Sequence, residues 1–209
     1  MDIILLRHPA LRAPEGMCFG RTDFPLAAGW RLYTQQWRRA LQPLYLQEAY
    51  ASEQRRSMEF AEQLGLGREL RVDERLNELD FGDWEGKRWN DLDQETLNAW
   101  MQDYARQQVP GGESYAQLSK RVRAWLSEVE EAKLQSAIVI SHKGPILALL
   151  AAASGLQLSK SFNFEIKPGR AIWLRYEQER WTVLGVNLGP QDIKGLNTGF
   201  ALSQTEYVV

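Results

Sequence analysis

The chain has 209 residues, of which 44% are hydrophobic and 25% are charged. This composition is typical of a globular protein and argues against disorder, and the length predicts a single domain over residues 1–209. The formal net charge of −2 gives no general basic surface, so nucleic acid and membranes are not expected partners. The apolar N-terminal run is too short for a membrane span and the single cysteine allows no internal disulfide, so we expect a cytoplasmic protein.

The N-terminal part of the chain predicts a strand that ends at a histidine. Residues 2–6 form a short apolar run typical of a buried strand. Pro9 disfavours both a continued strand and a helix at His8, so Arg7 and His8 are expected at the carboxyl end of this strand. A loop rich in Pro and Gly follows. The pattern then predicts a helix over 26–41, a strand over 47–51 and a helix over 53–64.

The middle of the chain predicts a weak strand, a structured loop and two helices. The weak strand is 69–72, and the acidic and aromatic residues of 75–86 follow neither the helical nor the strand period. A helix is expected over 91–106. After a Pro-Gly-Gly stop, a long amphipathic helix is expected over 113–133.

The second strong strand signal is the apolar run 137–140, which ends at Ser141-His142. Gly144 and Pro145 then open an apolar helix over 146–153, with proline at a tolerated first-turn position. Three further strands are predicted, and the last two pair as a hairpin: 162–166, 171–176 and 181–186. The tail from residue 189 has no readable pattern.

Helices that interleave with short apolar strands predict a three-layer α/β/α sandwich with a mainly parallel central sheet. Ligands in such sheets bind at the carboxyl ends of the strands. The chain has only two histidines, His8 and His142, and both are predicted to follow a buried strand. Each alone is compatible with an ordinary buried polar residue, but two in the same context indicate a shared site.

Several familiar catalytic patterns are missing from the sequence. Zinc usually needs three or four ligands with short-range pairs, and neither a His-x-x-His nor a Cys-x-x-Cys pair occurs. The Gly-x-Ser-x-Gly elbow of serine hydrolases and the Gly-x-x-x-x-Gly-Lys phosphate loop are also absent. We therefore expect no metal and no cofactor.

Phosphoryl transfer through a histidine nucleophile fits the remaining residues. Neutral imidazole is a competent nucleophile near neutral pH, and arginines such as Arg7 and Arg56 match the oxygens of a phosphoryl group. The leaving oxygen needs a proton, and the acid-rich segment offers five carboxylates that residue type alone does not separate: Glu74, Glu78, Asp80, Asp83 and Glu85.

Five segments in chain order resemble the histidine phosphatase superfamily, the phosphoglycerate mutase-like proteins. They are Leu6-Arg7-His8, Ala-Ser-Glu-Gln-Arg-Arg-Ser at 51–57, the acidic segment 76–86, Pro-Gly-Gly-Glu-Ser at 110–114, and Val-Ile-Ser-His-Lys-Gly-Pro-Ile at 139–146. Each match alone is weak, but together they use both histidines. The family usually has glycine where Pro9 stands and often where Lys143 stands, which bears on pocket shape more than on chemistry.

The resemblance implies a metal-independent phosphatase that forms a phosphohistidine. His8 would attack phosphorus, and Glu78 would protonate the leaving oxygen and then activate water. The phosphoryl oxygens would be held by Arg7, Arg56, His142 and the backbone N–H of Lys143.

Within the superfamily, the loop end at 18–26 and the short length are most similar to alpha-ribazole phosphatases, which remove a 5′-phosphate late in cobalamin assembly. We therefore expect a small phosphorylated substrate, with alpha-ribazole 5′-phosphate as the leading candidate. The alternatives are a phosphoglycerate mutase, a phosphoprotein phosphatase and a non-catalytic binding module. The short segment between Glu78 and His142 favours hydrolysis. Mutases of this type generally have a longer segment between the acid and the second histidine, which shields the phosphohistidine from water.

Three side chains are candidate substrate contacts: Arg12, Arg21 and Trp84. The arginines are equally compatible with solvated surface residues, and most of the eight tryptophans with core or helix-face positions. Trp84 and Trp89 follow the acidic residues closely enough to line a pocket beside them. The sequence indicates no oligomeric state.

Overall fold

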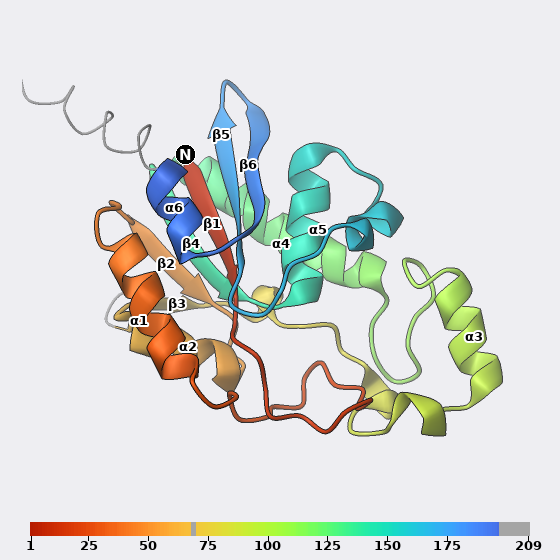
Figure 1. Cartoon of the computed structure of the whole chain (residues 1–209). Helices are drawn as coiled ribbons and strands as arrows, with labels where there is room; N and C mark the ends of the chain where they lie inside the picture. Colours follow the sequence, from red (N-terminus) through yellow and green to blue (C-terminus); the bar gives the residue numbers. More distant parts are fainter. Residues whose placement is uncertain (68–69, 197–209) are drawn as a thin grey trace, which may run out of the picture.

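A computed structural model describes residues 1–67 and 70–196 of the chain (Figure 1). Its strands are β1 (Asp2–Arg7), β2 (Glu48–Ala51), β3 (Leu70–Val72), β4 (Ser136–Ser141), β5 (Ala171–Glu177) and β6 (Arg180–Leu188). They form one six-stranded sheet in the order β3-β2-β4-β1-β5-β6. The first four of these in sheet order run parallel, and β5 and β6 are antiparallel to their neighbours. The prediction of a mainly parallel sheet is confirmed.

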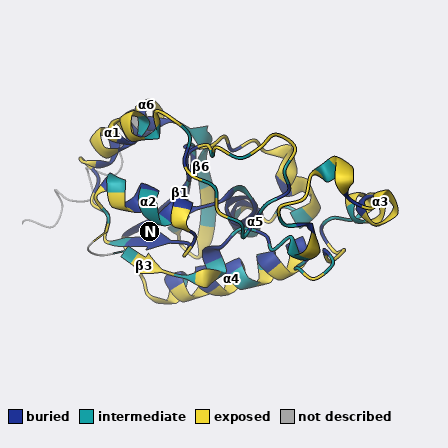
Figure 2. Cartoon of the chain, turned by 90° about the horizontal axis from the view of Figure 1, so that it is seen from below, coloured by how far each residue is buried: buried dark blue, intermediate teal, exposed yellow. Residues whose placement is uncertain are grey.

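The α-helices of the described part are α1 (Trp30–Leu41), α2 (Arg55–Leu64), α3 (Gln94–Gln102), α4 (Tyr115–Glu131), α5 (Lys143–Ser154) and α6 (Pro190–Leu196). One apolar core joins the sheet to α4 and α5, and a second joins its other face to α1 and α2. The predicted three-layer sandwich is therefore confirmed. Helix α3 lies at one end of the molecule, away from the sheet (Figures 1 and 2). In residues 1–67 and 70–196, no helix is long and apolar enough to cross a membrane.

Strand β1 is buried on both faces, because successive side chains of a strand point to opposite layers. Ile3 and Leu5 pack in the core of α4 and α5, whereas Ile4 and Leu6 pack in the core that contains Trp37 of α1. A strand buried in this way has a continuous apolar sequence. This is the physical reason why the strand signals at 2–6 and 137–140 are so clear.

The pairing of β1 with β4 brings the two histidines to one edge of the sheet. Arg7 and Ser141 are paired in register at the carboxyl ends of these strands. The backbone N–H of His8 donates to the carbonyl oxygen of Ser141 at 3.0 Å. His8 and His142 are therefore the first residues beyond two adjacent parallel strands, as predicted.

Helix α1 begins four residues later than predicted. Leu26 forms an isolated antiparallel bridge with Leu11, and Gly29 has a φ of 82°, a left-handed conformation that glycine adopts without strain. Residues 26–29 therefore belong to the preceding loop. Helical periodicity cannot reveal such a bridge, because its partner lies in another part of the loop.

The predicted strand 162–166 is wrong. Residues Leu158–Asn163 form a short 3₁₀ helix, η4, after which the chain is irregular. Phe162, Phe164 and Ile166 alternate with polar residues and so imitate a half-buried strand. Only Ile166 is buried, and the two phenylalanines are about two-fifths exposed, at 41% and 39%. In the C-terminal tail, where the sequence has no readable pattern, residues Pro190–Leu196 form α6. Residues 197–209 lie outside the described residues.

Candidate active site

The two histidine rings lie side by side in a buried site. Their centroids are 5.0 Å apart, and His8 and His142 are 5% and 0% exposed. The Nδ1 of His8 lies 2.7 Å from the carbonyl oxygen of Pro9. Because a carbonyl only accepts, Nδ1 carries the proton, and Nε2 keeps the lone pair that a nucleophile needs. Pro9 therefore fixes the tautomer of His8 through its carbonyl oxygen, and the missing N–H of proline plays no part in this contact.

His142 is held by polar contacts on both sides of its ring. Its Nδ1 accepts from Nε of Arg56 at 3.2 Å, and its Nε2 lies 2.6 Å from Oγ of Ser52. A guanidinium only donates, so Nε2 carries the proton and donates to Ser52. A hydroxyl can also donate. If Ser52 donated to Nε2 instead, the proton on Nδ1 would face the Nε–H of Arg56, and the hydrogen bond between Arg56 and His142 would be lost.

The surroundings of both histidines favour the neutral ring. Burial lowers the pKa of each ring well below its usual 6.5, and the positive charge of Arg56 lowers it further. A neutral imidazole is the form that can attack phosphorus.

We expect the free energy of unfolding to fall between pH 7.5 and pH 5.5. The folded protein keeps both rings neutral, whereas an unfolded histidine has a pKa of about 6.5 and binds a proton below that pH. This part of the stability is fully present above about pH 6.5 and is lost as the pH falls toward the folded pKa. Each ring should remove about 1 kcal/mol over this interval. Urea unfolding at the two pH values measures the loss.

The variant His8→Gln removes one of the two titrating rings. Its pH-dependent loss of stability should therefore be smaller than that of the unaltered protein by about 1 kcal/mol. Identical losses in the two proteins would contradict the neutral state of His8.

Arg7 carries a buried N–H that has no acceptor. Its Nη1 donates to the carbonyl oxygen of Ile166 at 2.7 Å, but its buried Nε has no hydrogen-bond partner among the described residues. Such donors are rare in folded proteins, and an oxygen of a bound phosphoryl group would satisfy this one. Burial lowers the pKa of Arg7, and the negative charge of Glu78 opposes this effect.

Arg56 fastens the loop after β1 to the site. It is 1% exposed, and its Nη1 donates to Asp23 Oδ1 at 2.7 Å and to the Thr22 carbonyl at 3.0 Å. Its Nη2 donates to the carbonyl oxygen of Gly20. With Nε bound to His142, most N–H groups of Arg56 have protein partners, and its charge lies between the loop and the second histidine.

The geometry separates Glu78 from the neighbouring carboxylates. Glu85 accepts the backbone N–H groups of residues 20–22 and of Phe81, so it is a structural anchor of the loop. Asp80 accepts from the N–H of Gly82, and Glu74 and Asp83 are exposed. Glu78 is the acid that contacts the segment after His142.

Glu78 is bound at the start of α5. Its Oε1 accepts the backbone N–H of Gly144 at 3.1 Å. A Cβ at position 144 would collide with that oxygen, so only glycine permits this approach. Lys143 is the first residue of α5, where N–H groups have no partner inside the helix and the helix dipole favours an anion. The first turn of α5 thus adds positive potential beside the histidines.

Most of the chain matches the model of one protein family. The model of the histidine phosphatase superfamily (branch 1) matches residues 3–189. The chain belongs to this superfamily. The predicted family and the prediction of a phosphatase are confirmed.

Two relatives and one solved structure that resemble this chain are named as phosphatases. Adenosylcobalamin/alpha-ribazole phosphatase of Escherichia coli (strain K12) is 28% identical over 206 residues, which cover 95% of this chain and 96% of that protein. Phosphoserine phosphatase 1 of Hydrogenobacter thermophilus is 26% identical over 195 residues, covering 90% and 92%. The crystal structure of the alpha-ribazole phosphatase from Shigella flexneri matches with a TM-score of 0.83 and 27% identity, covering 90% of this chain and 96% of that one.

Two polar residues of this phosphatase were not predicted to support the site. Gln54 is buried; its Nε2 donates to the carbonyl of Gly20 at 2.5 Å, and its Oε1 accepts the N–H of Glu78 at 2.8 Å. Ser52 contacts His142. Both belong to the polar segment after β2, and their position directly beyond a buried strand was the available signal. Residue type alone did not show which partners they would reach.

The candidate substrate contacts occupy different environments. Arg21 is partly exposed and lies in the loop segment that Arg56 binds. Its Nη1 lies 3.7 Å from Oε1 of Glu53. Arg12 is exposed in the same loop. Trp84 is 4% exposed and packs in a small apolar cluster with Cys18, so its position favours a packing role over substrate contact.

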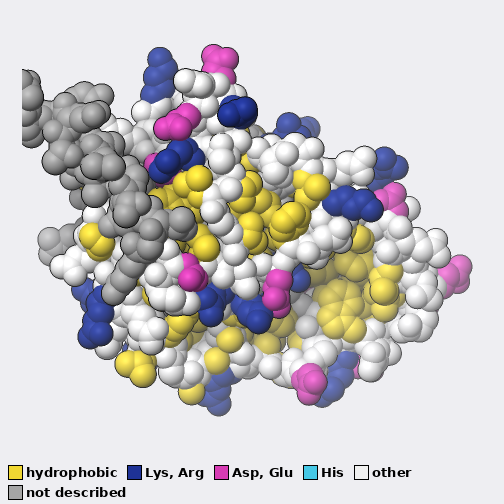
Figure 3. Space-filling model, turned by 45° about the horizontal axis from the view of Figure 1, so that its top comes forward, with side chains coloured by type: hydrophobic (Ala, Val, Ile, Leu, Met, Phe, Trp, Pro, Cys, Tyr) yellow, Lys and Arg dark blue, Asp and Glu magenta, His cyan; other side chains and the backbone are white. Residues whose placement is uncertain are grey.

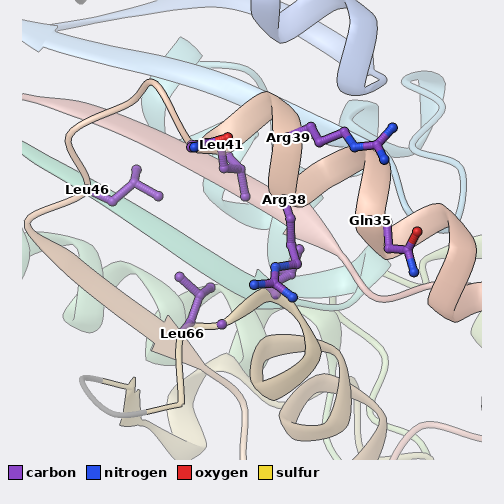
Figure 4. A pocket seen from close by; sticks show the side chains of 9 residues that line it. Gln35, Arg38, Arg39, Leu41, Leu46 and Leu66 are labelled. Carbon is purple, nitrogen blue, oxygen red and sulfur yellow. The ribbon is translucent and has the colours of Figure 1, made fainter.

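A broad hollow of 630 Å³ lies between α1 and the C-terminal end of α2. It is lined by side chains of α1 and of the segment after α2, among them Arg38, Arg39 and Leu66 (Figure 4). None of the candidate catalytic residues lines it. Within residues 1–67 and 70–196, no group of three or more His, Cys, Asp or Glu side chains could hold a metal ion.

Proposed function

We propose that this chain hydrolyses a small phosphate monoester through a phosphohistidine on His8. Two observations carry the proposal: the proton on His8 Nδ1 leaves Nε2 with the lone pair of a nucleophile, and the buried Nε–H of Arg7 has no acceptor among the described residues. The Nε2–P bond forms as the ester P–O bond breaks, and Glu78 gives its proton to the leaving oxygen. In the second step Glu78 takes a proton from water, and the resulting oxygen attacks phosphorus and releases His8.

Positive groups around the phosphoryl oxygens support both steps. Arg7 would donate through Nε, and Arg56 adds charge at the opposite side of His142. The N–H of Lys143 would donate from the start of α5. For His142 to donate to a phosphoryl oxygen, the bound substrate must displace Arg56 from its Nδ1 or Ser52 from its Nε2. No step of this scheme requires a metal ion.

The substrate we propose is alpha-ribazole 5′-phosphate, hydrolysed in the cytoplasm. Two of the relatives named above are alpha-ribazole phosphatases, and one of these matches along 95% of the chain.

A panel of phosphate monoesters tests this proposal. We expect kcat/KM for alpha-ribazole 5′-phosphate to exceed that for O-phosphoserine and 3-phosphoglycerate by about tenfold or more, since specific leaving-group contacts discriminate on this scale. Phosphate release should be equal with and without a chelator. A higher kcat/KM for O-phosphoserine, or loss of activity on chelation with rescue by one divalent ion, would count against the proposal.

A further inference from the structure

A cavity of 410 Å³ lies between the α3 region, the start of α4 and η4. This volume is within the usual range of small-molecule sites. The side chains that define it are apolar or aromatic: Leu79, Phe81, Trp89, Trp100, Tyr115 and Phe162. Hydrophobic side chains also gather on the side of the molecule that carries α3 (Figure 3). We call this hollow the aromatic cavity.

The aromatic side chains that line the cavity pack against one another. Trp89 stacks on Trp100 at 6.2 Å between centroids, and Phe81 meets Trp89 edge-on at 5.6 Å. Tyr115 and Phe162 lie 5.0 Å apart. Rings held in this way present flat apolar faces, which suit another aromatic ring.

One polar group of the wall is bonded within the protein, whereas the buried Nε1–H of Trp100 has no hydrogen-bond partner among the described residues. The hydroxyl of Tyr115 lies 3.2 Å from the carbonyl oxygen of Gly144 and 3.0 Å from Oγ of Ser161. Among the described residues that line the cavity, none is charged. The Nζ of Lys143 lies 5.3 Å from the ring centroid of Phe162, which is one of the lining side chains. A charged leaving group would therefore lose its hydration in the cavity without gaining a charged partner from the lining residues.

The aromatic cavity adjoins the acid that would protonate the leaving oxygen. Leu79 of its wall directly follows Glu78. Tyr115 of its wall bonds the carbonyl of Gly144, and the N–H of the same Gly144 holds the Glu78 carboxylate. The leaving oxygen must lie within hydrogen-bond distance of Glu78 to take its proton. The carbon skeleton attached to that oxygen then lies against the cavity.

We propose that the aromatic cavity binds the leaving group of the substrate, and that this group is an alcohol carrying an uncharged aromatic ring. This inference rests on the proposed phosphatase function. As His8 takes the phosphoryl group, the ester P–O bond breaks, the alcohol receives the proton of Glu78, and its ring stays in the cavity. A serine leaving group would instead bring an ammonium and a carboxylate to a wall whose lining residues carry no charge.

Three alkyl phosphates of similar leaving-group chemistry test the assignment: 2-naphthylmethyl phosphate, ethyl phosphate and O-phosphoserine. We expect kcat/KM for the naphthylmethyl ester to exceed that for ethyl phosphate by about 10- to 100-fold, the effect of burying a large apolar side group. Phe162→Ala should lower this ratio by about fivefold or more. Phe164→Ala is the matched control, because Phe164 is equally exposed but does not line the cavity; its ratio should stay at the value of the unaltered protein.

Calorimetric titration with 2-naphthylmethanol separates the two proposals, because this alcohol has no phosphate. It should bind the unaltered protein and the Phe164→Ala variant, and bind Phe162→Ala more weakly. Equal kcat/KM for the three esters, or a preference for O-phosphoserine, would overturn the cavity assignment and leave the phosphatase proposal standing. Phosphate release from none of the three would overturn the phosphatase proposal and the leaving-group role with it, even if the alcohol binds.

Discussion

Replacing His8 by alanine should lower kcat/KM for every phosphate monoester by about 10⁴-fold or more, as the loss of a covalent nucleophile typically does. The reason is local. His142 cannot take over, because its Nδ1 accepts from Arg56 and its Nε2 contacts Ser52. The charged side chains that act on His8 are Arg56 and Arg7, whose guanidinium groups are not nucleophiles while protonated. Steady-state phosphate release from an alkyl phosphate measures the effect.

The fold should survive this replacement, because the side chain of His8 makes its recorded hydrogen bond only to Pro9. A thermal unfolding midpoint close to that of the unaltered protein therefore serves as the control. If folded His8→Ala retained activity within tenfold of the original, the reaction would have to use another nucleophile.

The second large effect concerns Glu78. Glu78→Gln should slow the hydrolysis of an alkyl phosphate by about 10²–10⁴-fold, the usual contribution of a positioned proton donor. Phosphorylation of the enzyme by p-nitrophenyl phosphate should slow much less, because nitrophenolate leaves without a proton. Burst kinetics separates this first step from the later hydrolysis of phosphohistidine, which also needs Glu78. The amide oxygen of glutamine can still accept the N–H of Gly144, so the local geometry should be kept.

Asp83→Asn is the matched control for this experiment, since Asp83 is an exposed acid of the same segment. It should change either rate by less than about twofold, as expected for a surface carboxylate away from the reacting atoms. Equal slowing of the first step for both substrates in Glu78→Gln would show that Glu78 has a structural role.

The order of strands and helices was predictable because the buried strands have sequences that few other elements share. Runs such as 2–6 and 137–140 are apolar on both faces, and each ends at a histidine. Together with the rule that ligands bind at the carboxyl ends of parallel strands, this pattern predicts that His8 and His142 lie close together. The register of Arg7 with Ser141 confirms that placement.

The contacts that set the tautomer and orientation of each side chain could not be predicted from the sequence. The tautomer of His8 depends on a carbonyl one residue away, and that of His142 on Ser52 and Arg56. Local periodicity does not specify such orientations. The same limit applies to Gln54, which looks like a surface glutamine in sequence but joins Gly20 to Glu78 in the fold.

The error at 162–166 has an instructive cause. Alternating apolar residues predict a strand that buries one face in a sheet. Phe162 instead lines the aromatic cavity. The aromatic rings that line the cavity come from positions 81 to 162 of the chain. A pattern read within one short window cannot show that Trp89 and Phe162 meet around the same space.

Rapid-quench trapping on the unaltered protein tests the central claim most directly. The protein is mixed with a ³²P-labelled alkyl phosphate, quenched in alkali within the first turnover, and digested for peptide mapping. We predict one labelled peptide, the one containing His8, with phosphate that is stable in alkali and released by acid. Label on any other residue, or full turnover with no labelled protein at any quench time, would contradict a phosphohistidine intermediate on His8.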